Sequence, residues 1–117
     1  MRYAVRTRLF ALVDESEDLP RVKHYRGFPP ELTGGKDARV LLPVARVIVL
    51  ELKLSGAYLY RYAADASFGG ETWHPTIDDA KHQARFEFGD AMSDWQEIPS
   101  DADDAMTYAL ARLPATK

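Results

Sequence analysis

The stretch VIVLELKLSGAYLYRY, residues 47–62, decides the fold of this chain. Its first half alternates, so that one face carries Ile48, Leu50, Leu52 and Leu54 and the other carries Val47, Val49, Glu51 and Lys53. Ser55 and Gly56 form a pair that is typical of a tight turn. The second half alternates again, and one of its faces carries Tyr58, Tyr60 and Tyr62. A strand, a two-residue turn and a second strand predict a β-hairpin with a row of tyrosines on one side.

Residues 2–13 alternate in the same way and predict another half-buried strand. One face of this strand carries Leu9, Ala11 and Val13, and the other carries Arg2, Arg6, Arg8, Phe10 and Leu12. Residues 38–46 predict an extension of the hairpin's first strand, in which Pro43 marks an edge, a bulge or a break because proline lacks a backbone N–H. Residues 14–37 hold a charge run, prolines and glycines, and they predict a long surface loop that allows a short strand at 21–26.

The first predicted helix follows a loop over residues 65–70 that ends in Gly69-Gly70. Thr76 suits the N-cap position of this helix, and Asp79 stands where the acidic residue of a capping box belongs. Apolar residues with helical spacing then follow at Ile77, Ala80, Ala84 and Phe88. Gly89 is suited to cap the carboxyl end.

A short extended segment over residues 95–98 leads to the second predicted helix, which Ser100 begins and Pro114 ends. Its apolar stripe consists of Ala102, Ala105, Met106, Ala109, Leu110 and Leu113. Strands come first and helices later, which predicts a single α+β domain over residues 1–117. We expect an antiparallel sheet of three to five strands with both helices packed on one face.

The composition excludes several kinds of function. Cysteine is absent from the 117 residues, which removes disulfides, thiolate nucleophiles and cysteine-ligated metals. No segment is long and apolar enough for a membrane span, and no export signal is visible, so we expect a cytoplasmic protein without a membrane partner. The net charge of −3 argues against nucleic acid as a partner. Basic residues dominate residues 1–61 and acidic residues dominate 62–117.

The segment GGETWHPTIDDAKHQARFEFG, residues 69–89, contains the only cluster of side chains that suggests chemistry. The helix caps explain its Asp78 and Asp79, because helix amino ends attract carboxylates. A metal-dependent enzyme would use His74, Asp78 and His82, with Glu71 as a fourth ligand, but their spacing matches no metal signature. Glycine loops for phosphate and a serine elbow are also absent. We therefore expect no catalytic residue, no metal and no cofactor.

Four side chains in this segment are not explained by folding. They are Trp73, His74, His82 and Phe86. Phe86 lies on the predicted helix opposite Ile77, and exposed aromatic side chains can mark a contact surface. We interpret the four as binding residues of a small non-catalytic module that acts through protein–protein contact, with a different protein or with a second copy of the chain.

The same segment, continued to Trp95 and Ile98-Pro99, resembles small stand-alone bacterial proteins of uncharacterised function. The resemblance runs from about Leu50 to Pro99 and implies no catalytic residues. Gly70-Glu71-Thr72 followed by Asp79-Ala80 is also similar to HicB-like antitoxins, which implies an antitoxin- or immunity-like role. The chain departs from those antitoxins by the inserted residues 73–76 and by lacking a recognisable DNA-binding tail.

One alternative is a nucleic-acid-binding module. The arginine face of the first strand would contact the backbone, and Tyr58, Tyr60 and Tyr62 would stack on bases. This alternative requires the tyrosines to be free of helices and on the same face as the arginines. The metal-dependent enzyme remains the other alternative.

Overall fold

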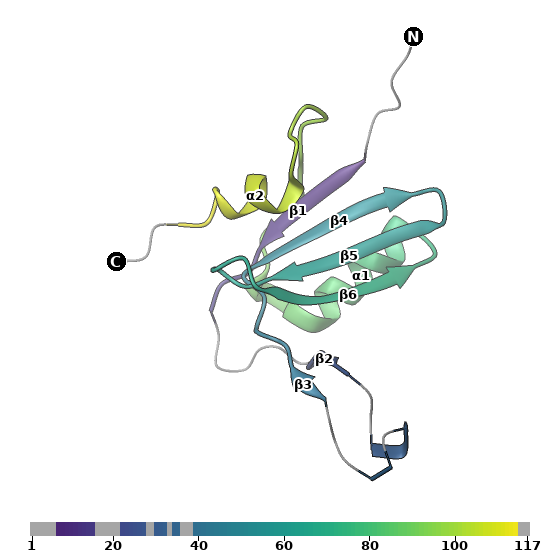
Figure 1. Ribbon diagram of the computed structural model, residues 1–117. Helices are drawn as coiled ribbons and strands as arrows, with labels where there is room; N and C mark the ends of the chain where they lie inside the picture. Colours follow the sequence, from purple (N-terminus) through teal and green to yellow (C-terminus); the bar gives the residue numbers. More distant parts are fainter. Residues whose placement is uncertain (1–6, 16–21, 28–29, 33, 36–38, 115–117) are drawn as a thin grey trace.

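The computed structural model describes residues 7–15, 22–27, 30–32, 34–35 and 39–114 (Figure 1). The strands are β1 (Arg8–Leu12), β2 (Tyr25–Arg26), β3 (Val40–Leu41), β4 (Val47–Lys53), β5 (Gly56–Tyr62), β6 (Phe68–His74) and β7 (Gln96–Glu97). The helices are α1 (Ile77–Phe88) and α2 (Ala105–Leu110), with 3-10 turns η1 (Pro30–Leu32) and η2 (Gly89–Ala91). Strands precede and accompany the helices in an α+β arrangement, as predicted. No helix among the described residues is long and apolar enough to cross a membrane.

The predicted hairpin forms the centre of the main sheet. Five strands are ordered β6-β5-β4-β1-β7, and every pairing is antiparallel. The hairpin's turn lies one residue earlier than predicted, because Lys53 pairs with Gly56 and leaves Leu54 and Ser55 as the turn. Strand structure is interrupted at Pro43, which was one of the predicted alternatives, so β3 and β4 are separate strands.

Strand β6 was not predicted, because Gly69-Gly70 indicates a loop by local propensity. Tertiary contacts explain why glycines stand inside this strand. A Cβ at Gly69 would lie 3.1 Å from the carbonyl oxygens of Arg61 and Pro43. Gly70 has φ +118, and a Cβ there would lie 3.2 Å from the His24 side chain. The two glycines therefore serve close approach of neighbouring chain segments rather than a turn.

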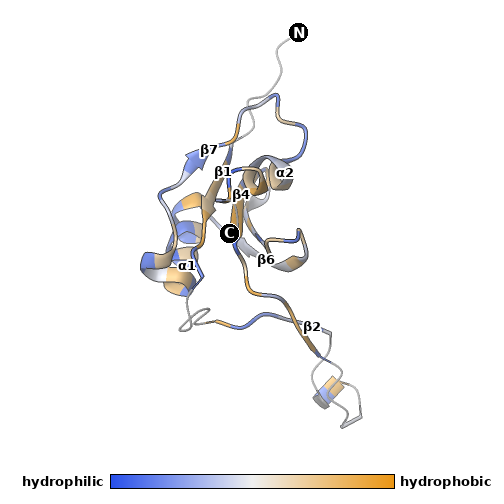
Figure 2. Cartoon of the chain, turned by 90° about the vertical axis from the view of Figure 1, so that its left-hand side faces the viewer, coloured by the Kyte–Doolittle hydropathy of each residue, from blue (hydrophilic) through white to orange (hydrophobic). Residues whose placement is uncertain are grey.

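The two helices lie on opposite faces of the sheet, so the prediction that both pack on one face is wrong (Figure 1, Figure 2). On the α1 side the core contains Ala11, Ile48, Leu50, Ala57, Leu59, Ala80, Ala84 and Phe88. On the α2 side it contains Phe10, Val47, Val49, Ile98 and Ala109. The cause is β4, whose Val47 to Leu50 are buried throughout, so both of its faces need an apolar cover.

Helix α1 matches its prediction from end to end. Thr76 Oγ1 accepts a hydrogen bond of 3.1 Å from the Asp79 N–H, and Gly89 forms the C-cap with φ +53. Thr76 is thus the cap, and the aspartates of the first turn are favourable partners of the helix dipole.

Helix α2 begins four residues later than predicted. Asp104, not Ser100, is its N-cap and accepts a bond of 3.1 Å from the Thr107 N–H. The buried Arg8 explains the delay, because its Nη2 donates to the carbonyl oxygens of Pro99, at 2.7 Å, and Ala102, at 2.8 Å. These carbonyls are held in a turn by the strand beneath and do not enter the helix.

We call residues 22–27, 30–32, 34–35 and 39–44 the arm. It carries β2, η1 and β3, and it extends from the sheet beside β6 (Figure 1). β2 and β3 form a separate two-stranded sheet. The short strand predicted within residues 21–26 is β2, at Tyr25–Arg26.

Candidate functional site

A buried ion pair joins β5 to α1. Alternation along β5 places Arg61 on the same face as Ala57 and Leu59, and helical spacing places Glu87 on the same side of α1 as Ala84. Arg61 is 1% exposed and Glu87 0%. Arg61 Nε donates to Glu87 Oε1 at 2.8 Å, and Nη2 donates to Oε2 at 2.5 Å. The pairing is bidentate, the strongest arrangement of these two groups.

Further side chains complete the hydrogen bonds of this pair. Gln83 Nε2 donates to Glu87 Oε2 at 2.8 Å, and His24 Nε2 lies 2.8 Å from Glu87 Oε1. Arg61 also donates to the carbonyl oxygen of Leu59 and to Thr72 Oγ1, both at 3.1 Å. A buried ion pair is tolerated when its remaining donors and acceptors are satisfied in this way.

The environment of Glu87 keeps it ionised. Burial by itself would raise the pKa of this carboxyl. The hydrogen bonds and the charge of Arg61, with the donors of Gln83 and His24, outweigh burial and hold the pKa below its ordinary value. The pair is therefore Arg⁺ with Glu⁻ at neutral pH.

His74 belongs to the outer end of the same network. Its Nε2 lies 2.7 Å from Thr72 Oγ1, which also accepts a bond from Arg61. Burial, and after it the charge of Arg61, lowers the pKa of His74, although Asp79 and Glu87 act in the opposite direction. A neutral imidazole can accept the Thr72 hydroxyl proton at Nε2, which is consistent with this geometry.

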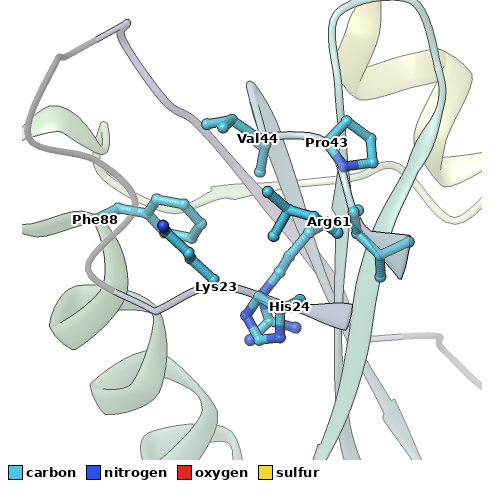
Figure 3. Close-up of a pocket in the computed structure, with 10 residues that line it drawn as sticks. Lys23, His24, Pro43, Val44, Arg61 and Phe88 are labelled. Carbon is cyan, nitrogen blue, oxygen red and sulfur yellow. The ribbon is translucent and has the colours of Figure 1, made fainter. Parts of the chain in front are cut away.

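A pocket of about 190 Å³ adjoins the buried pair (Figure 3). Its polar lining comes from Lys23, His24 and Arg61, and the rest comes from Leu41, Leu42, Pro43, Val44, Ala45, Gly69 and Phe88. In Figure 3 the Lys23 side chain reaches toward Phe88, while Arg61 extends toward His24. The pocket is thus an apolar space with cationic groups on one side.

His24 connects the arm to the rest of the protein. Its ring contacts Glu87 and lies against Gly70, and its carbonyl oxygen accepts a bond of 2.8 Å from the Leu42 N–H. His24 and Leu42 line the pocket and also a second depression outside it. His24 and Leu42 therefore form the wall between the pocket and the outer surface beside β6.

The second depression is an open groove of about 400 Å³ between the arm and β6. It is lined by His24, Tyr25, Arg26, Leu42, Phe68, Gly70, Glu71 and Trp73. Three of these are exposed aromatics: Tyr25 is 47% exposed, Phe68 43% and Trp73 53%. β6 is the edge strand of the main sheet, so one side of its backbone has no strand partner among the described residues. The groove thus combines an uncovered strand edge with aromatic walls.

The tyrosine row lies on the α2 side of the sheet, as the predicted alternation requires. Tyr58 and Tyr60 stack with ring centroids 6.3 Å apart. Lys53 Nζ lies 4.7 Å from the centre of the Tyr58 ring and donates to the Tyr60 hydroxyl at 3.0 Å. The tyrosines are half-buried, and Tyr60 and Tyr62 border the α2 core without being covered by it.

The basic strip required for nucleic-acid binding is not present as predicted. Arg8 is 3% exposed and is occupied by the carbonyls of Pro99 and Ala102. Arg2 and Arg6 lie outside the described residues. Lys53 is therefore a cationic neighbour of the tyrosines, whereas Arg8 is not available to contact nucleic acid.

The structure separates the four predicted binding residues. Trp73 and His74 are neighbours in β6 with side chains on opposite sides of the sheet, one in the groove and one in the buried network. His82 and Phe86 are exposed on α1, and His82 lines a different depression together with Trp95. Only Trp73 lines the groove directly, and binding by the other three stays a prediction.

The proposed ligands of a metal are also apart. Within the described ranges, no three His, Asp or Glu side chains are grouped closely enough to hold a metal ion. His74 is engaged with Thr72, while Asp78 and His82 are exposed on α1.

Sequence reasoning missed His24, Arg61 and Glu87. A signal for two of them was present: Arg61 continues the inward alternation of Ala57 and Leu59, and Glu87 follows the inward spacing of Ala84. Opposite charges at core positions of two adjacent elements predict a buried pair, because an unpaired charge there is very costly. His24 had no comparable signal, since its contact depends on the path of the arm.

Comparison with protein-family models, with curated proteins and with solved structures finds no match to this chain. Its function is therefore inferred from the geometry of the site.

Proposed function

We propose that the protein is a small non-catalytic binding module that acts through protein–protein contact. The groove between the arm and β6 receives an extended segment of the partner. The observation that carries this proposal is the seven-residue edge strand β6 facing a groove with three exposed aromatic side chains.

The backbone of β6 supports this reading because an edge strand offers a row of N–H and C=O groups to an added strand. Specificity in such complexes comes from the alternate side chains of the added strand, which enter neighbouring pockets. Tyr25, Phe68 and Trp73 provide apolar contact areas for them, and large aromatics contribute much of the binding energy at interfaces. Arg26 and Glu71 add one charge of each sign.

An antitoxin- or immunity-like role is one form of this proposal, in which the bound segment belongs to a toxin. A toxin encoded by a neighbouring gene would support that form. Self-association is another form of the proposal. It would appear as a dimer that dissociates on dilution, so that the measured average molecular mass falls.

Selection from a library of extended peptides tests the proposal. We expect the selected peptides to protect amides of β6 from hydrogen exchange when they bind. Trp73→Ala should weaken their binding at least tenfold, while Phe86→Ala, an equally exposed aromatic on α1, should leave it unchanged. Protection confined to other elements, or equal effects of the two substitutions, would contradict the groove as the contact surface. Circular dichroism of both variants controls for loss of fold.

Nucleic-acid binding is the second candidate, favoured by the stacked Tyr58 and Tyr60 beside Lys53. Such a platform can accept bases. A salt-dependent titration with a mixed single-stranded oligonucleotide, weakened by Tyr58→Ala, would support this function. An oligonucleotide that fails to bind at low salt would exclude it.

A further inference from the structure

The pocket beside the buried ion pair is a second site, separate from the groove. Its size suits one compact apolar group, because cavities of about 150 Å³ with apolar walls bind benzene and this pocket measures about 190 Å³. Leu42, Val44 and Phe88 supply walls of this kind. The wall toward the groove is His24, which the ion pair and the Leu42 N–H hold in place.

The charges around the pocket do not balance. Arg61 is neutralised by Glu87, and both are buried. Lys23 is exposed and makes no hydrogen bond or ion pair with any residue that the structure describes. Among the residues that the structure describes, the Lys23 ammonium group thus stands beside an apolar space without a partner, and Glu87, the acidic group of the network, is already paired with Arg61.

We propose that this pocket binds a small apolar carboxylate: an aromatic or branched apolar group fills the space, and its carboxylate pairs with Lys23. A carboxylate can pair with the Lys23 ammonium group, whereas a cation would be repelled by it. The apolar part gains by leaving water for walls that carry few polar groups. This site would stand even if the groove bound no partner.

Benzoate and benzamide are matched probes, because they share a ring and differ in charge. Titrations followed by amide NMR should show saturable benzoate shifts at Val44, Ala45 and Gly69. We expect benzamide to bind at least tenfold more weakly at the same amides. Absence of shifts at these amides, or equal affinities for the two probes, would overturn the proposal.

Two exposed cations of the arm provide the matched variants. Lys23→Gln should remove the preference for benzoate, while Arg26→Gln, which lies in the groove and not in the pocket, should retain it. Unchanged preference in Lys23→Gln would also overturn the proposal. The amide spectra themselves show whether each variant is folded.

The same carboxylate chemistry occurs in free small acids and at the carboxyl end of a peptide. A short peptide ending in phenylalanine, with a free or an amidated terminus, distinguishes these sources in competition with benzoate. If the free-terminus peptide displaces benzoate with at least tenfold higher affinity, the ligand is a chain terminus. If the affinity of this peptide is equal to or lower than that of benzoate, the ligand is a free acid.

Discussion

The indole of Trp73 lies over the backbone of Gly56. A Cβ at Gly56 would stand 2.5 Å from Trp73 Nε1 and 2.6 Å from the carbonyl oxygen of His74. The indole nitrogen donates to the Ser55 carbonyl oxygen at 2.8 Å. Trp73 therefore fastens the β4–β5 turn to the edge strand while half of its surface remains open to the groove.

This contact makes Gly56 difficult to replace. Gly56 has φ +141, and no space exists for a side chain. We expect Gly56→Ala to lower the free energy of unfolding by about 2 kcal/mol, from backbone strain and displacement of the indole. Gly34→Ala is the control, since φ is +71 there but nothing lies within 4 Å. Equal losses in urea denaturation of the two variants would show that the indole contact contributes nothing.

Removal of one partner of the buried ion pair should be severe. Glu87→Gln leaves Arg61 charged in the core, and we expect a loss of about 3 kcal/mol in the free energy of unfolding. Replacing both, in Arg61→Met/Glu87→Leu, should recover most of that loss. Glu15→Gln breaks the exposed Arg46–Glu15 pair and should cost at most about 0.5 kcal/mol. A double variant as unstable as the single one would refute this account.

The same pair predicts a dependence on acid. The pKa of Glu87 is lower in the folded protein than in the unfolded chain, so the unfolded state binds the proton first as pH falls. The stabilisation is complete above the unfolded value of about 4.5 and declines as pH falls below it toward the folded pKa. Urea denaturation between pH 6 and pH 3 should show a steeper loss for the wild type than for Arg61→Met/Glu87→Leu. Parallel profiles would exclude Glu87 as a source of the acid sensitivity.

The observed start of α2 can be tested at its cap. Asp104→Ala removes the acceptor for the Thr107 N–H and should lower the free energy of unfolding by about 1 kcal/mol. Ser100→Ala should change it by less than about 0.5 kcal/mol, because Ser100 is exposed and precedes the helix by several residues. The reverse order of effects in thermal or urea denaturation would restore Ser100 as the cap.

Local sequence patterns predicted the elements that depend on near neighbours. The β4–β5 hairpin and α1 follow from alternation, helical spacing and caps, and the structure has them within a residue. Strand β6 could not be predicted from local patterns. Its Gly69-Gly70 pair is required by close contacts with Arg61, Pro43 and His24, which lie elsewhere in the sequence. The opposite placement of the helices was visible in Val47 and Val49, since apolar residues on the second face of β4 require a second cover.

The candidate site was less predictable than the fold. Trp73 was identified as a binding residue by exclusion, and it lines the groove. The cluster of histidines and carboxylates in residues 69–89 drew attention to His82, which the structure places away from Arg61 and Glu87. His24 joins the site only through the path of the arm, and no local pattern encodes that path.

The position of the arm between β1 and β4 also has a consequence for the order of folding. β4, β5, β6 and α1 follow one another without interruption, so their contacts close short loops, whereas β1 must pair with β4 across the whole arm. Short loops close at a smaller entropic cost, and we expect this contiguous unit to form in the transition state before β1 docks. Leu59→Ala should then slow refolding, while Phe10→Leu should mainly accelerate unfolding. Stopped-flow measurement of both rates decides the order, and a Phe10 variant that refolds as slowly as the Leu59 variant would reverse it.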